Sequence, residues 1–246
     1  MDKVLKIGQA SAVGSIQLFI GRIVSTIILA VGTIMLGLFI LESDYGLYVV
    51  ALIPATTFLL FQDWGLGSAV TRYCAKCRSV NEESALRKVI LSGFIFEAAT
   101  GLALTVLGIV TANFVASNLF GKPESVFLIA LASITILSSA IGVVPSGVFV
   151  GFENMKISSW LLILLSLIQG LAAPLLVFLG FGALGALIAF TMGSVVTGIV
   201  STILMYFLFY RKLPRTKFNM SDIARTLKSL LSFPQWNVFR ASNGLD

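Results

Sequence analysis

The sequence has no histidine and two cysteines, and charged residues make up only 11% of its 246 residues. Histidine is the side chain that most often serves acid–base catalysis near neutral pH, so its absence removes the usual catalytic base. Two cysteines alone cannot complete a four-ligand zinc site. So few charges cannot cover the surface of a soluble domain. Since there is also no nucleophile elbow, no Walker loop and no cluster of acids, we expect neither an enzyme nor a metal or cofactor.

Long apolar runs take the place of the missing charge. The chain is 57% hydrophobic, with a mean hydropathy of +0.99. A helix needs about 20 apolar residues to cross a hydrocarbon layer about 30 Å thick, and strands of membrane barrels would alternate instead. Six stretches are long enough: 14–41, 46–70, 89–112, 125–150, 157–179 and 183–210. The sequence therefore predicts an all-α integral membrane protein. Residues 1–210 would form a six-helix transmembrane bundle.

Lysine and arginine gather in every second connection, which sets the expected orientation. This group comprises Lys3, Lys6, Arg72, Lys76, Arg78, Arg87, Lys88, Lys156, Arg211, Lys212, Arg215, Lys217, Arg225 and Lys228. The opposite connections hold Lys122, beside Glu42, Asp44 and Glu124. We therefore expect a multi-pass protein of the cytoplasmic membrane with both termini in the cytoplasm. The net charge of +6 then indicates contact with anionic headgroups rather than with nucleic acid.

Two connections have predicted structures of their own. The longest one, about residues 71–88, is expected to be a cytoplasmic loop with a short amphipathic helix near residues 82–88. Residues 211–246 are expected to form a basic surface segment followed by the incomplete start of a seventh span, as in a truncated chain or fragment.

Polar and small residues recur at helical spacings along four of the predicted spans. The four stripes are Ser15, Arg22, Thr26 and Thr33; Glu97, Thr100, Thr105 and Gly108; Thr135, Ser138, Ser139, Gly142 and Ser146; and Thr191, Ser194, Thr197, Gly198 and Ser201. Such stripes either let membrane helices pack closely or line a hydrated cavity. Both interpretations remain open for the fourth and sixth spans, whereas intramembrane charges favour a cavity for the first three.

Three ionisable residues, Arg22, Asp63 and Glu97, fall inside predicted spans. A rise of 1.5 Å per residue places all three about 10–12 Å from the cytoplasmic ends of their helices. Because an isolated charge in a membrane is costly, such groups usually pair or face water. We expect Arg22 to pair with Asp63 or Glu97 at the inner mouth of a central cavity. The alternatives are a purely structural ion pair or an Asp63 side chain that reaches the interface.

Pro54, Pro145 and Pro174 also fall inside predicted spans. Proline removes a backbone donor and kinks helices, so each marks a candidate bending point, either static or part of gating.

Two short patterns resemble better-known motifs. Gly180 to Gly185 spells GxGxxG, but no acidic residue follows until Asp222, so we expect a tight turn between helices rather than a dinucleotide site. Cys74 and Cys77 form a CxxC pattern. Without further ligands or a redox fold around them, we expect ordinary thiols.

Four segments, taken in order, resemble one known family. They are Tyr45-Gly46-Leu47-Tyr48, the run from Asp63 to Tyr73 (DWGLGSAVTRY), the run from Gly147 to Lys156 (GVFVGFENMK), and the run from Leu179 to Ala186 (LGFGALGA). Together they are similar to the N-terminal half of polysaccharide and O-antigen repeat-unit flippases. These belong to the multidrug/oligosaccharidyl-lipid/polysaccharide exporter superfamily.

The resemblance implies a transporter of two six-helix lobes around a central cavity. Such transporters move polyprenyl-diphosphate-linked oligosaccharides between leaflets by alternating access. In this chain Arg22 would meet the diphosphate in the cavity and Arg72 the headgroup at the cytoplasmic edge. The chain supplies six spans where the family usually has 12 to 14, so a second half-transporter or a homodimer is an expected partner. The alternatives are a multidrug cation antiporter, in which Asp63 and Glu97 matter more, and a non-transporting scaffold or degenerate fragment.

Overall fold

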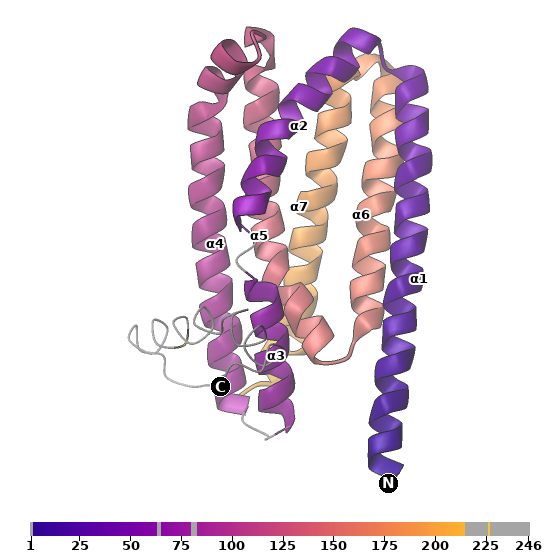
Figure 1. The fold of residues 1–246 in the computed structure, drawn as a ribbon, viewed down its shortest axis with the longest axis vertical. Helices are drawn as coiled ribbons and strands as arrows, with labels where there is room; N and C mark the ends of the chain where they lie inside the picture. The colour runs from indigo at the N-terminus through magenta and orange to yellow at the C-terminus, as the bar shows by residue number, and fades with distance from the viewer. Residues whose placement is uncertain (1, 63–64, 80–82, 215–225, 227–246) are drawn as a thin grey trace, which may run out of the picture.

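The computed structural model describes residues 2–62, 65–79, 83–214 and 226. The elements of these ranges are all helical. The long helices are α1 (Asp2–Phe39), α2 (Glu42–Gln62), α3 (Leu66–Ser79), α4 (Glu83–Phe114), α5 (Val126–Gly151), α6 (Met155–Leu176) and α7 (Gly182–Leu208). Short helical turns span Val115–Leu119, Pro123–Ser125, Val177–Phe181 and Tyr210–Lys212. The long helices run roughly along one direction, with α1 at one edge beside α6 (Figure 1). The predicted all-α fold is confirmed.

Five stretches of the described residues are long and apolar enough to cross a membrane, where the sequence predicts six spans. They are Val13–Phe39, Glu42–Arg78, Glu83–Leu119, Pro123–Gly151 and Met155–Lys212. The last stretch contains both α6 and α7 in succession. Positive φ angles of 91° at Gly180 and 51° at Gly182 separate the two helices, which lie side by side in Figure 1. The GxGxxG segment is thus a tight helix–helix turn, as predicted.

The second predicted span is wrong as a continuous helix, and so is the loop predicted after it. The structure ends α2 at Gln62 and begins α3 at Leu66, after Gly65 with a φ of 72°. Helix α3 extends to Ser79, and α4 already begins at Glu83, so the predicted helix near residues 82–88 forms the first turns of α4.

Helix α3 is amphipathic, which explains why its basic sequence folds as a helix. Val70, Cys74 and Cys77 are buried. Arg72 and Lys76 are exposed on other faces of the helix. A hydropathy pattern alone cannot distinguish such a helix from a polar loop.

Glycines bring the long helices into close contact. A Cβ atom on Gly32 of α1 would overlap the backbone of Gly170 of α6, and one on Gly21 would lie 2.5 Å from Cβ of Ser159. Ser159 Oγ donates a hydrogen bond to the Gln17 carbonyl oxygen at 2.9 Å, which joins the same two helices. Small residues allow this approach where lipid gives no hydrophobic force between helices.

The same kind of contact centres the bundle on α5. On its α4 side, a Cβ atom on Gly108 would lie 2.6 Å from Oγ of Ser133. On its α7 side, a Cβ atom on Gly198 would lie 2.7 Å from the carbonyl oxygen of Ser138. Helix α5 therefore forms the core against which α4 and α7 pack.

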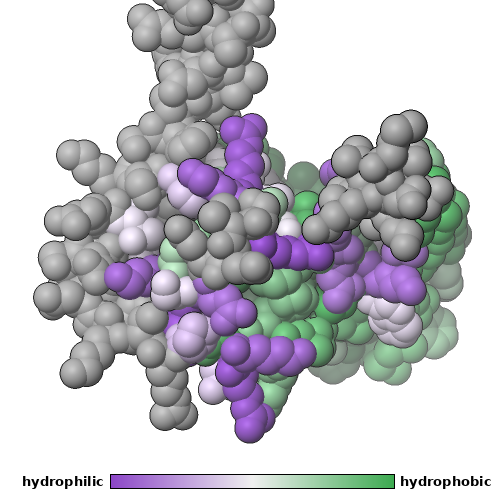
Figure 2. Space-filling model, turned by 90° about the horizontal axis from the view of Figure 1, so that it is seen from below, coloured by the Kyte–Doolittle hydropathy of each residue, from purple (hydrophilic) through white to green (hydrophobic). Residues whose placement is uncertain are grey.

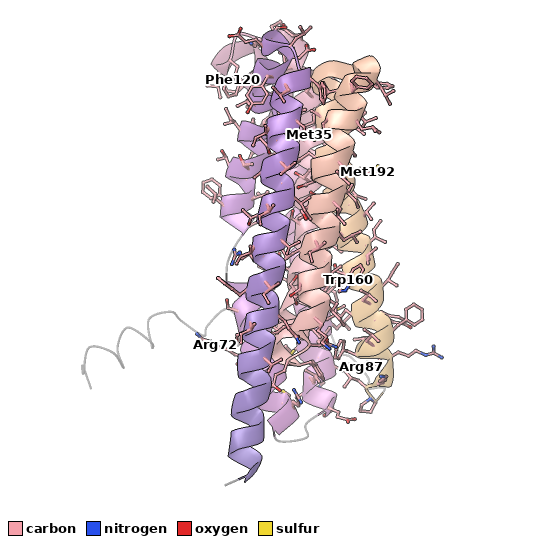
Figure 3. The ribbon with its side chains drawn as sticks, turned by 90° about the vertical axis from the view of Figure 1, so that its right-hand side faces the viewer. Met35, Arg72, Arg87, Phe120, Trp160 and Met192 are labelled. Carbon is pink, nitrogen blue, oxygen red and sulfur yellow. The ribbon has the colours of Figure 1, made fainter. Side chains whose placement is uncertain are left out.

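The two ends of the bundle carry different charged residues. Hydrophilic side chains gather on the end face seen in Figure 2, and Arg72 and Arg87 lie toward this lower end in Figure 3. Glu42 and Asp44 open α2 at the other end.

Arg87 ties the chain beyond α7 to the start of α4. Its Nη1 atom donates hydrogen bonds to the carbonyl oxygens of Leu213 at 2.9 Å and Pro214 at 3.2 Å. Its guanidinium carbon lies 4.6 Å from the ring centroid of Tyr210. The basic surface segment predicted for residues 211–246 otherwise lies almost wholly outside the described residues.

Replacing Gly32 with alanine should separate α1 from α6. The added methyl group meets backbone, which cannot rotate away, so we expect a loss of about 1–3 kcal/mol in stability. Thermal unfolding of the detergent-solubilised protein measures this change. Gly37→Ala on the same helix is the matched control, because a Cβ atom there has nothing within 4 Å. Equal melting temperatures for the two variants would contradict the close α1–α6 contact.

Candidate functional site

Helix α1 presents its polar stripe away from the helix on which it packs. Gly21, Ser25 and Gly32 are buried toward α6, whereas Arg22, Thr26 and Thr33 are exposed. The bulky exposed side chains, among them Ile23 and Ile27, lie on a further face of the same helix. The structure thus gives α1 a packing face, a polar face and an apolar face.

Arg22 is the one charged residue among residues 13–39 of α1. The Thr26 and Thr33 hydroxyls donate to the carbonyl oxygens of Arg22 and Leu29 in their own helix, each at 2.8 Å. These two hydroxyls are therefore satisfied without water. Within the described residues, the guanidinium of Arg22 has no hydrogen-bond or ion-pair partner. The Arg22 side chain is thus exposed on the same face of α1 as Thr26 and Thr33.

Glu97 lies in the opposite environment. It is 1% exposed in the middle of α4. Its Oε2 atom accepts a hydrogen bond from Nε2 of Gln62, the last residue of α2, at 3.2 Å. A buried carboxylate needs such donors, since burial without them costs several kcal/mol. The contact joins α4 to the point where α2 stops.

The expected pairing of Arg22 with Glu97 is not among the contacts of the described side chains. Among the described side chains, Arg78 and Glu153 form an ion pair at 3.5 Å. Arg22 is exposed on α1, whereas Glu97 points into the bundle toward Gln62. Asp63, the other expected partner, lies outside the described residues.

Some members of the polar stripes on α4, α5 and α7 lie in helix–helix contacts. Thr105 Oγ1 of α4 donates to the Ser133 carbonyl oxygen of α5 at 3.2 Å. Gly198 of α7 packs on Ser138 of α5, whose hydroxyl donates to its own helix. The packing interpretation holds for these contacts, whereas Ser146 of the α5 stripe is exposed and its hydroxyl donates to the Gly142 carbonyl oxygen of its own helix.

The three prolines lie inside helices that continue on both sides of them. Pro54 is within α2, Pro145 within α5 and Pro174 within α6, and all three are buried. A π-helical turn begins three residues after Pro174, at Val177. Their role in gating stays a prediction.

The four segments that carry the family resemblance meet in pairs, which the sequence did not reveal. At one end, a Cβ atom on Gly147 would lie 2.7 Å from the Gly67 carbonyl oxygen, and one on Gly151 would lie 2.7 Å from Cβ of Cys74. At the other end, Asp44, which directly precedes the Tyr45 segment, contacts Gly182. The spacing of Gly147 and Gly151 by four was a usable signal for the first contact.

A shallow hollow lies at the end of the bundle that carries Asp44. Its volume is about 370 Å³, and its lining includes Asp44, Glu124, Phe127 and the turn from Gly180 to Leu184. The described residues contain no group of three or more potential metal ligands, and both cysteines are buried in the apolar core.

A family model described as polysaccharide biosynthesis protein matches residues 11–239. No curated protein matches the chain. Three similar solved structures are a MOP superfamily transporter from Pyrococcus furiosus, an outward-facing multidrug resistance transporter of the MATE family, and a MATE protein in a bent conformation. Their identities are 20%, 22% and 19%, with TM-scores of 0.71, 0.68 and 0.70.

The match covers 90%, 90% and 91% of this chain and 50%, 50% and 52% of the three structures, in that order. The chain therefore spans about half the length of these proteins. At these identities the likeness shows a common fold.

Replacing Gln62 with methionine should destabilise the junction of α2 and α4. Loss of an amide donor to a buried carboxylate costs about 1–3 kcal/mol. Thermal unfolding in detergent measures the effect. The control is Thr57→Val, because the Thr57 hydroxyl bonds its own helix and is exposed. A Gln62→Met variant as stable as the control would show that the hydrogen bond to Glu97 does not contribute to the stability of the protein.

Proposed function

This chain belongs to the polysaccharide biosynthesis protein family, and on that premise we propose that it is one half of a lipid-linked oligosaccharide flippase. In this proposal it moves polyprenyl-diphosphate-linked oligosaccharides across the cytoplasmic membrane by alternating access. Its fold is that of membrane transporters of the MOP superfamily. No catalytic step is required, because the substrate changes leaflet without changing its covalent structure.

The observation that carries the proposal is the exposed Arg22 on the polar face of α1. A diphosphate is anionic at neutral pH and cannot enter hydrocarbon without a compensating charge. Arginine suits this task because its guanidinium stays charged and binds phosphate oxygens in a bidentate manner. The stripe of Arg22, Thr26 and Thr33 follows the helix axis, so it offers the headgroup a polar track along α1.

The charge distribution supports a six-span arrangement with both termini in the cytoplasm. Basic residues of α3, the start of α4 and the end of α7 lie at one end of the bundle, among them Arg72 and Arg87 (Figure 3). The other end is acidic at the start of α2. By the positive-inside rule the basic end faces the cytoplasm. Arg72 then lies where a headgroup first arrives.

The length of the structural relatives supports a second lobe. The chain spans 50% of the first of them, so the other wall of a central cavity would come from a further six-span lobe or a second copy. Pro54, Pro145 and Pro174 are the positions where the helices of this half would bend during the exchange of conformations.

A cation antiporter is the second candidate, and the burial of Glu97 favours it. A carboxylate that is 1% exposed inside an apolar bundle is a typical proton or cation carrier. Glu97→Gln keeps a side chain of the same shape and removes the charge. Loss of drug resistance with intact surface glycan would support the antiporter, whereas loss of surface glycan would contradict it.

Replacing Arg22 with alanine should reduce glycan export about tenfold or more. A hydrogen bond to a charged group contributes about 1.5–3 kcal/mol, and both headgroup contacts and charge compensation are lost. Surface glycan is measured in cells that depend on this protein. Arg22→Lys should retain part of the export because it keeps the charge.

Arg211→Ala is the control for loss of a cation, since Arg211 lies beyond α7. It should export normally at matched protein level. Full export by Arg22→Ala would remove Arg22 from the transport path and with it the main support for the proposal.

A further inference from the structure

Helix α3 is docked on the end of α5 through four successive contacts. Gly67 approaches Val143 at 3.3 Å, measured from the position of an added Cβ. Thr71 Oγ1 donates to the Gly147 carbonyl oxygen at 3.1 Å. Cys74 packs on Gly151, and Arg78 pairs with Glu153 beyond it. The first three contacts are buried or partly buried, so the ion pair is the exposed end of the docked surface.

Glu153 occupies a backbone position that favours glycine. Its φ is 58°, the left-handed region, directly after the end of α5. The amide of Asn154 donates to the Phe149 carbonyl oxygen, and the amide of Glu153 to that of Val150. This pair of hydrogen bonds is the Schellman motif, in which the left-handed residue is usually glycine. A glutamate here is strained relative to glycine.

The side chain of Glu153 pairs with Arg78. Nη1 of Arg78 and Oε2 of Glu153 lie 3.5 Å apart, and the two side chains remain 49% and 36% exposed. Arg78 belongs to the same short helix as the exposed Arg72 and Lys76, so three basic residues face outward from α3. A phosphate group that approaches this helix competes with Glu153 for the guanidinium.

We propose that Arg78 and Glu153 form a clamp that holds α3 on α5. A phosphate-bearing headgroup opens this clamp by binding Arg78 in place of Glu153. The clamp stands on the contacts above, and the choice of a lipid-linked ligand rests on the proposed function. Opening frees α3 from the glycines of α5 at the basic end of the bundle, where a headgroup would arrive. The carboxylate of Glu153 acts only through Arg78, so it is a positioning residue.

The two cysteines of the chain report directly on the clamp. Cys74 and Cys77 are both buried, and Cys74 lies against Gly151. Undocking of α3 therefore exposes thiols, and the rate of N-ethylmaleimide labelling measures the open population. The protein is used as the full chain in dodecyl maltoside, a detergent without phosphate, with labelled thiols counted by mass spectrometry.

Neutralising either partner should speed the labelling. We expect Arg78→Gln and Glu153→Gln to label about two- to fivefold faster, the range of an exposed ion pair. Glu153→Gly should label as fast as these two variants, although it relieves the backbone strain at this position. This result would separate the effect of the carboxylate from the effect of the strain. The reversed pair, Arg78→Glu with Glu153→Arg, should restore slow labelling. Lys156→Gln, on the first turn of α6, should label as the unaltered chain does.

The ligand is tested with four probes, on the unaltered chain and on Arg78→Gln. A short prenyl diphosphate should speed labelling, the matching prenyl alcohol should not, and Arg78→Gln should abolish the response. Equal acceleration by phosphatidylglycerol would assign the phosphate to bilayer lipid, and acceleration by inorganic phosphate would show that no lipid chain is needed.

Two results would overturn the inference. Unchanged labelling in all the Arg78 and Glu153 variants would mean that the pair does not hold α3. No response to any phosphate probe would mean that phosphate is not what opens it. Neither result depends on export by Arg22→Ala, so failure of the clamp and failure of the proposed function are distinguishable.

Discussion

Close approach of helices at small residues is the constraint on which the rest of this structure depends. Lipid is as apolar as a leucine side chain, so burial of apolar surface does not drive membrane helices together. Packing must do so, and here it does where glycine meets backbone, as at Gly32 on Gly170 and at Gly198 on Ser138. On α1 the glycines make this contact with α6, while the neighbouring stripe of Arg22, Thr26 and Thr33 stays exposed.

The same contacts give the four family segments a common physical meaning. The segment that contains the start of α3 lies on the end of α5. The start of α2 lies on the turn between α6 and α7. Each pair fixes one end of the bundle. A transporter that alternates between two conformations needs lobes that move as units, and fixed ends provide this. In our account the substrate passes along α1 while these ends hold the rest of the lobe together.

Long apolar runs predicted most helices to within a few residues, but the break between α2 and α3 was missed. Apolar residues continue through Leu66 and Val70, so hydropathy does not mark the left-handed Gly65 that ends the helix. The direction in which the Arg22 side chain points, away from the buried Glu97, was beyond prediction for another reason. Depth along a helix follows from residue number, whereas the direction of a side chain depends on which face packs. The glycines of α1 carried that information, because they repeat one residue before the polar stripe.

The most direct test of the account is whether the polar face of α1 is in contact with water at membrane depth. Single cysteines at Arg22, Thr26 and Thr33 are compared with cysteines at Ile23 and Ile27, in a chain whose own cysteines are replaced by serine. A charged, membrane-impermeant thiol reagent should modify the first three and spare the last two, and a prenyl diphosphate should protect Arg22→Cys. Equal reactivity on both faces, or none on the polar face, would contradict a headgroup path along α1.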